Sequence, residues 1–275
     1  MIIARTLNEL EAARAGLGPL GLAPTMGALH AGHLALLAAA RAQGLAPAAS
    51  IFVNPTQFGP NEDFSRYPRD EAGDLAKLEA AGCALVWMPA VAEMYPPGGA
   101  TVVHMDGPAR LWEGPVRPGH FDGVATVVAK LLGQVRPAAA FFGEKDWQQL
   151  QVVRRMTADL HLPVRIEPVP TVREADGLAM SSRNRYLSPE ERATAPGFYA
   201  ALREVAADLA AGAPVEATLA AARDRLIAQG MLPDYLALVQ AETLEPLAVL
   251  QAPARLLAAA RLGPVRLLDN LGVPG

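Results

Sequence analysis

Short apolar runs alternate with amphipathic segments through the first 170 residues, and this alternation restricts the fold more than any other feature of the sequence. The runs have the length of buried strands, whereas the segments between them carry apolar residues at helical spacing. Repeated alternation of this kind predicts an α/β fold, in which a parallel sheet has helices on both faces. We expect strands at 20–23, 46–53, 84–88, 138–142 and 164–169, an edge strand at 101–105, and helices at 6–15, 34–41, 70–81, 121–135 and 147–160.

The pattern changes after residue 188, where the sequence predicts a smaller second domain. Ser188 followed by Pro189 is typical of a helix start, with serine as the N-cap and proline in the first turn. A further helix is expected over 215–229, and strands over 234–240, 255–260 and 265–269. We therefore place the first domain at 1–171 and an α+β domain with a short antiparallel sheet at 172–275.

Composition limits the classes of protein that this chain can belong to. The 275 residues are 51% hydrophobic and 19% charged, which supports a packed core and argues against disorder. The net charge of −4 gives no basic surface for nucleic acid, and no apolar run is long enough to cross a bilayer. A single cysteine, Cys83, fits a reducing compartment. We expect a soluble cytoplasmic protein with no nucleic-acid or membrane partner.

The stretch from Pro24 to His33 contains the most specific chemistry in the sequence. It leads from an apolar run through Gly27 and Gly32 into an alanine- and leucine-rich segment, so a strand is expected to turn there into a helix. A helix start presents backbone N–H groups and the positive end of the helix dipole, which favour phosphate. His30 and His33 lie on one face of the first turn and can donate hydrogen bonds. Two alternatives remain from this stretch alone, namely ordinary surface histidines or half of a metal site.

Other polar clusters also follow expected strands. Asn54 and Gln57 follow 46–53, Lys145 follows 138–142, and Ser181, Ser182 and Arg183 lie in a long irregular loop after 164–169. The chain has three lysines, and a lysine beside a glycine at a strand-to-helix turn is typical of a phosphate ligand. Simple turn chemistry, solvated charge or an interdomain linker are the alternatives. Because parallel strands end at one edge of a sheet, we expect these clusters to converge.

These segments resemble two signatures of the adenylyl-transferring Rossmann enzymes. His30-Ala31-Gly32-His33 is similar to the HIGH signature, and Met180-Ser181-Ser182-Arg183 is similar to KMSKS. The segments 52–58, 142–146 and 173–184 resemble one family in particular, the pantoate–β-alanine ligases (pantothenate synthetases). The resemblance covers nearly the whole chain, and it implies a Rossmann-like first domain.

The resemblance also implies a two-step reaction and a set of site residues. Pantoate would attack the α-phosphate of ATP to give pantoyl adenylate and pyrophosphate, and β-alanine would then displace AMP to give pantothenate. The catalytic residues implied are His30, His33 and Lys145. The implied ATP-binding residues are Met26, Gly27, Ala28, Leu29, His30, Ala31, Gly32, His33, Gly143, Glu144, Lys145, Asp146, Val172, Met180, Ser181, Ser182 and Arg183.

The acceptor substrates and accessory groups are implied in the same way. Gln57 and Gln149 would bind pantoate, Gln57 would also meet β-alanine, and Asn54, Tyr67 and Arg117 are further candidates. The loop at 58–69 is the candidate lid. Mg²⁺ is expected on the ATP phosphates, with no tightly bound organic cofactor, and the family resemblance suggests a homodimer. Alternatives are another adenylyl transferase of this fold or a non-catalytic ATP-binding module.

Overall fold

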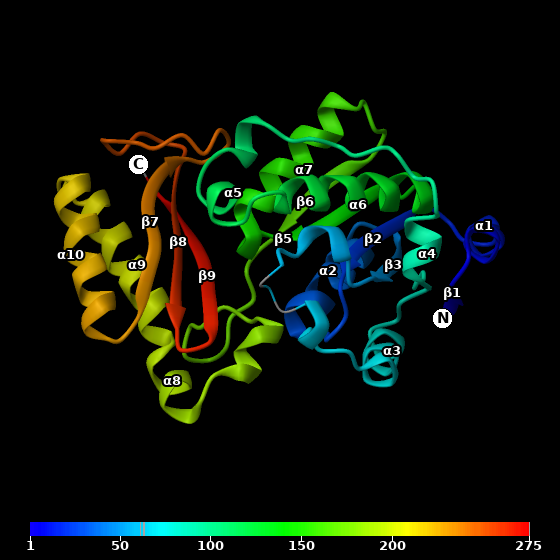
Figure 1. The fold of residues 1–275 in the computed structure, drawn as a ribbon, viewed down its shortest axis with the longest axis horizontal. Coiled ribbons are helices and arrows are strands. Elements are labelled where there is room, and N and C mark those ends of the chain that lie inside the picture. Colours follow the sequence, from blue (N-terminus) through cyan, green and yellow to red (C-terminus); the bar gives the residue numbers. More distant parts are fainter. Residues whose placement is uncertain (61, 63, 275) are drawn as a thin grey trace. The chain divides into compact units, whose positions relative to one another are not determined.

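The computed structural model describes residues 1–60, 62 and 64–274 (Figure 1). The chain forms two compact units. The first contains Met1–Gly143 and Gln149–Pro170, and the second contains Glu144–Gln148 together with Thr171–Gly275. The short segment Glu144–Gln148 therefore packs with residues that follow it by more than a hundred positions.

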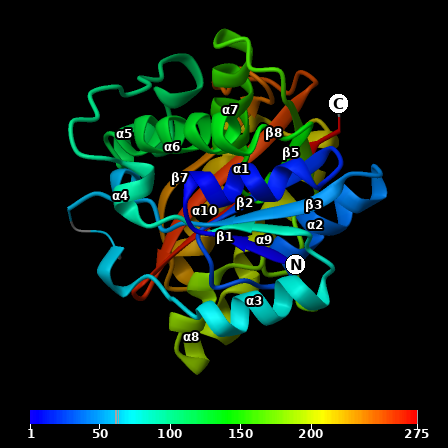
Figure 2. The ribbon, with the colours of Figure 1, turned by 90° about the vertical axis from the view of Figure 1, so that its right-hand side faces the viewer.

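A six-stranded parallel sheet with the order β1-β4-β3-β2-β5-β6 forms the centre of the first unit, as the strand–helix alternation predicts. Helices α1 and α6 lie on one side of the strands and α3 lies on the other (Figure 2). The strands are β1 (Ile2–Ala4), β2 (Leu20–Thr25), β3 (Ala46–Ile51), β4 (Leu85–Trp87), β5 (Ala139–Gly143) and β6 (Arg165–Val169). The helices of this part of the chain are α1 (Leu7–Ala15), α2 (Ala31–Ala42), α3 (Glu71–Ala80), α4 (Val91–Met94), α5 (Glu113–Val116), α6 (His120–Val135) and α7 (Trp147–Asp159).

Two details of this sheet differ from the prediction. The edge strand β1 was not predicted, because three residues are too few to show a period. The strand expected at 101–105 is wrong, since no strand forms there. Its backbone N–H groups bond to side chains of α6 instead: Val103 donates to Thr126 Oγ1 at 3.0 Å and Met105 to Asp122 Oδ1 at 2.9 Å.

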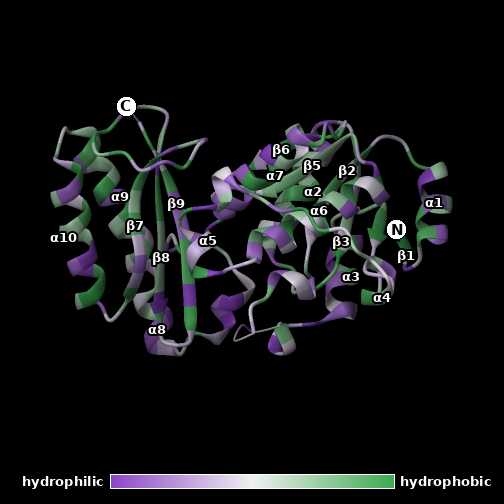
Figure 3. Ribbon diagram, turned by 45° about the horizontal axis from the view of Figure 1, so that its top comes forward, coloured by the Kyte–Doolittle hydropathy of each residue, from purple (hydrophilic) through white to green (hydrophobic). Residues whose placement is uncertain are grey.

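The second unit is built on an antiparallel sheet with the order β7-β8-β9. Its helices are α8 (Pro189–Thr194), α9 (Pro196–Ala210) and α10 (Val215–Ala228), and its strands are β7 (Leu232–Gln240), β8 (Ala254–Leu262) and β9 (Val265–Val273). Ser188 is the N-cap of α8, as the sequence predicts, and it forms a capping box with Glu191. Hydrophobic and hydrophilic residues alternate along α10 (Figure 3), and its buried Leu219 and Leu226 belong to the core of this unit.

No helix in the described part of the chain is long and apolar enough to cross a membrane.

Candidate active site

The turn from β2 to α2 is held in an unusual backbone conformation. Gly27 and Ala28 both have positive φ angles, of 84° and 50°. The carboxylate of Asp74, which is 1% exposed, accepts the backbone N–H groups of Ala28 and Leu29, each at 2.7 Å. A Cβ atom at position 27 would lie 2.9 Å from Asp74 Oδ2, so this position requires glycine for space as well as for conformation.

Thr25 fixes the same turn from the strand side. Its hydroxyl donates to Ser50 O at 2.6 Å and accepts the N–H of Gly27 at 3.2 Å. The turn is thus tied to β3 by Thr25 and to α3 by Asp74. Because these groups are buried, water does not compete for their hydrogen bonds.

The two histidines form the N-terminal cap of α2. His30 is the N-cap, and its Nδ1 accepts the N–H of Gly32 at 3.1 Å, while His33 Nδ1 accepts the N–H of His30 at 3.3 Å. The rings are 4.1 Å apart between centroids. When an imidazole is neutral and its Nδ1 accepts, its proton is on Nε2. Each ring therefore has an Nε2–H donor, and Ala31 and Gly32 form the helical turn between them.

Asn54 orients the side chain of Gln57. Asn54 is 1% exposed, and its Nδ2 donates to Gln57 Oε1 at 3.0 Å and to Gly123 O at 3.1 Å. Its Oδ1 accepts from the hydroxyl of Tyr95 at 2.8 Å. The side-chain oxygen of Gln57 thus accepts a hydrogen bond from Asn54, and Gln57 Nε2 lies 3.4 Å from the sulfur of Met26. Tyr95 was not predicted, because only the tertiary fold brings it to this turn.

Arg117 and His120 support the backbone of Gln57. Arg117 makes two hydrogen bonds of 2.7 Å to the Glu62 carboxylate and one of 2.9 Å to His120 Nε2. His120 Nδ1 in turn donates to Gln57 O at 2.8 Å. Burial and the adjacent Arg117 charge lower the pKa of His120 to about 4, so the ring is neutral at physiological pH. Arg117 was predicted as a candidate, whereas Glu62 was missed.

The loop at 58–69 contains an aromatic cluster. Phe58 packs against Phe64 and Tyr67, with ring centroids 5.4 and 5.9 Å away. Tyr67 is 6% exposed, so within this structure it is a packing residue of the loop. Two positions of the candidate lid, 61 and 63, lie outside the described residues. Closure of the loop stays a prediction.

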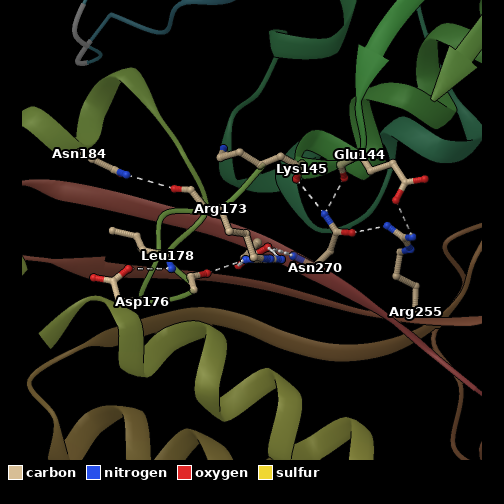
Figure 4. Close-up of polar contacts among 11 residues, drawn as sticks. Glu144, Lys145, Arg173, Asp176, Leu178, Asn184, Arg255 and Asn270 are labelled. Atoms are coloured by element: carbon tan, nitrogen blue, oxygen red, sulfur yellow. Dashed lines mark hydrogen bonds and ion pairs between the residues drawn. The ribbon is translucent and has the colours of Figure 1, made fainter. Parts of the chain in front are cut away.

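The lysine-bearing segment Glu144–Asp146 follows Gly143, the last residue of β5. Asn270 of β9 donates to the backbone carbonyls of Glu144 and Lys145, both at 2.8 Å (Figure 4). The Lys145 ammonium lies 3.5 Å from Asp146 Oδ1, and the Lys145 side chain is 21% exposed. This segment is therefore fixed through its backbone while the lysine side chain extends from it.

The segment 171–185, expected to be a long irregular loop, contains a bridged turn and the start of a short 3-10 helix. Arg173 and Ala179 form an antiparallel bridge, and the N–H of Met180 donates to Val172 O at 3.0 Å. Ser181 Oγ then accepts the N–H of Arg183 at 3.3 Å, which begins a short 3-10 helix over Ser182–Tyr186. Val172 and Met180, which the resemblance implies as ATP-binding residues, are thus paired across one turn.

Within each unit the structure brings several predicted residues together. In the first unit the turn at 25–30 and the segment at 54–57 follow the neighbouring strands β2 and β3, and they meet through Met26 and Gln57. Gln149 is half-buried on α7. In the second unit, 144–146 and the 172–180 turn both contact β9 residues. Convergence of all the clusters on one substrate stays a prediction.

One missed residue had a signal in the sequence. Asp74 precedes the buried Leu78 by four positions, so a helical projection places its carboxylate on the buried face.

Among residues 1–60, 62 and 64–274, no group of three or more His, Cys, Asp or Glu side chains is placed to hold a metal ion.

A parallel sheet with a capped helix start at the carboxyl end of a central strand is typical of Rossmann-like nucleotide-binding proteins. The sequence matches the family model for pantoate-beta-alanine ligase over residues 2–272. The pantothenate synthetase of Acidiphilium cryptum is 61% identical, over 99% of this chain and 100% of the relative. The chain therefore belongs to the pantoate–β-alanine ligase family.

Solved structures agree with this assignment. Pantothenate synthetase from Thermus thermophilus has a TM-score of 0.95 at 52% identity, and the match covers 100% of both chains. A pantoate-β-alanine ligase from Francisella tularensis, solved in complex with β-γ ATP and β-alanine, has a TM-score of 0.85 at 32% identity and covers 100% of this chain and 99% of that one. The predicted family and fold class are confirmed.

Proposed function

We propose that this chain condenses (R)-pantoate with β-alanine at the expense of ATP, through a pantoyl adenylate. A pantoate carboxylate oxygen attacks the α-phosphorus, and the bond to the pyrophosphate oxygen breaks. The β-alanine amine then attacks the acyl carbon, loses a proton, and expels AMP. The adenylate is the activated species, so no nucleophilic side chain is needed.

The observation that carries this proposal is the histidine cap at the start of α2. His30 and His33 each use Nδ1 to hold a backbone N–H, which leaves the proton on Nε2. Fixed N–H donors of this kind stabilise charge that develops on phosphate oxygens in the transition state. We assign both rings to the α-phosphate and the leaving pyrophosphate, as hydrogen-bond donors rather than as acids.

We assign the remaining phosphate contacts to Lys145, Ser181, Ser182 and Arg183. An ammonium and a guanidinium both favour phosphate oxygens, and arginine can bind two of them at once. Gly27 to Gly32 would approach the nucleotide with backbone atoms. The proposed domains are 1–171 and 172–275, and the second contains Ser181, Ser182 and Arg183.

Gln57 and Gln149 are assigned to pantoate, and Gln57 also to β-alanine. The Gln57 oxygen already accepts from Asn54, so the side chain offers N–H donors to a ligand. Such donors suit the hydroxyl and carboxylate oxygens of pantoate. Asn54 and Arg117 act on Gln57 and its loop in this proposal, and not on substrate.

Mg²⁺ would be bound mainly by the ATP phosphates, because magnesium in such sites uses few carboxylates and keeps several waters. It would neutralise charge on the pyrophosphate. We propose a homodimer by analogy with the family, and a cytoplasmic location that fits the single buried Cys83.

A half-reaction assay tests the proposal. ATP, Mg²⁺ and pantoate without β-alanine should release about one pyrophosphate per site, because the adenylate stays bound. Steady AMP and pantothenate formation should follow when β-alanine is added. Release of ADP, or no response to pantoate while ATP binds, would contradict it.

A further inference from the structure

Two adjacent polar residues interrupt the apolar strand β9. Asp269 and Asn270 are 3% and 4% exposed, although Val265, Leu267 and Val273 of the same strand belong to the hydrophobic core. Consecutive side chains of a strand point to opposite faces of the sheet. One strand therefore presents a buried carboxylate to one side and a buried amide to the other.

Asn270 holds the lysine-bearing segment. Its Nδ2 donates both of its N–H groups, to Glu144 O and Lys145 O, and its Oδ1 accepts from Arg255. Arg255 also contacts the Glu144 carboxylate at 3.3 Å (Figure 4). It lies 3.4 Å above the Trp147 ring. All three of these hydrogen bonds of the Asn270 amide therefore help to fix the backbone at Lys145.

Asp269 holds the turn before the second signature. It accepts two hydrogen bonds from Arg173, at 2.6 and 2.9 Å. Arg173 also donates to Gly177 O at 3.1 Å and lies 3.5 Å above the Tyr199 ring. The Asp269–Arg173 pair therefore fixes both ends of the turn that leads into Met180.

We propose that Asp269 and Asn270 are positioning residues that set the geometry of the two phosphate-binding segments from one strand. Asn270 acts through Lys145, and Asp269 acts through the 173–183 segment. This inference rests on the proposed function in one respect, namely that both segments bind ATP. Well-packed apolar residues commonly replace buried ion pairs without loss of stability, so stability alone does not explain a buried Asp–Arg pair.

Asn270→Ala removes both donors from the lysine segment. We expect ATP affinity, measured by calorimetry, to fall about tenfold, the ratio that corresponds to about 1.4 kcal/mol. KM for pantoate should change less than about twofold. If the alanine variant does not fold, Asn270→Asp keeps the side-chain volume and the Arg255 contact but lacks the donors.

A double-mutant cycle separates positioning from a general structural role. In a Lys145→Ala background, Asn270→Ala should lower ATP affinity by less than about twofold, because the group through which it acts is gone. In an Arg183→Ala background its full effect should persist, since Arg183 lies on the other segment. For Asp269→Asn we expect the reverse. Its effect on ATP affinity should persist in the Lys145→Ala background and should fall below about twofold in the Arg183→Ala background.

The control is Asp234→Asn, which disrupts an ion pair of the same sheet that joins β7 to β9, 2.6 Å from Asp234 Oδ2 to Arg266 Nε. It should leave ATP affinity unchanged. Additive effects of Asn270→Ala and Lys145→Ala, or unchanged ATP affinity with a lower melting temperature, would overturn the inference. If the unmodified protein forms no pyrophosphate with pantoate while the ATP-binding cycle behaves as expected, the proposed function fails and the inference stands.

Discussion

The buried His120 makes the stability of the first unit depend on pH. Its pKa is lowered from 6.5 to about 4 by burial and by the Arg117 charge. As pH falls, the unfolded chain takes up this proton before the folded chain does. The stabilisation from neutral His120 is therefore complete above about pH 6.5 and is lost as pH falls toward about 4.

The two pKa values give the size of the effect. Between about pH 7.5 and about pH 5, proton uptake by the unfolded state removes about 2 kcal/mol of unfolding free energy. Glu62 contributes little in this interval: burial opposes ionisation, but the Arg117 hydrogen bonds outweigh it and hold the Glu62 pKa below its ordinary 4.5. Asp122 raises the pKa of the exposed His104. His104 is present in both proteins compared below, so its contribution cancels.

The assay is urea unfolding of the unmodified chain and of His120→Asn at both pH values. Asparagine keeps a donor near Gln57 O but has no titratable group. The unmodified chain should lose about 2 kcal/mol more than the variant over this interval. Equal losses in the two proteins would refute the reasoning, because they would show that His120 titrates alike in the folded and unfolded chain.

Three further substitutions test the site. His33→Ala should slow pantoate-dependent pyrophosphate release by about 10² or more while the chain stays folded, and unchanged turnover would remove His33 from the mechanism. Gln57→Ala should raise KM for pantoate and β-alanine far more than for ATP; a defect confined to ATP would contradict its assignment. Asp74→Asn replaces one of two buried acceptors by a donor, so it should cost about 2 kcal/mol of stability and also slow adenylate formation. Asp70→Asn, which exchanges one good N-cap for another on the same helix, is its control and should do neither.

Local pattern was enough to predict most of the fold. Strand β2, the glycine turn and α2 follow from one apolar run, two glycines and a helix-forming segment, and the structure confirms them. The failure at 101–105 has a long-range cause, because the donors there bond to Asp122 and Thr126 on α6. No pattern within 101–105 contains that information.

The residues of the candidate site also fall into those that local pattern predicts and those that only the tertiary fold reveals. Residues within signatures, such as His30, Lys145 and Ser182, could be named from the sequence, although their roles stay predictions. The residues that hold those signatures in place could not, since Asp74 and Asn270 act on segments 45 and 125 positions away. Their contribution is a geometric one that depends on the packed fold.

The most direct test of the adenylate mechanism follows one oxygen atom. Pantoate labelled with ¹⁸O in its carboxylate is incubated with ATP, Mg²⁺ and β-alanine, and the products are examined by mass spectrometry. If the carboxylate attacks the α-phosphorus, one labelled oxygen is transferred to AMP in each turnover. Unlabelled AMP, or label found in inorganic phosphate, would contradict a pantoyl adenylate and with it the roles given to His30 and His33.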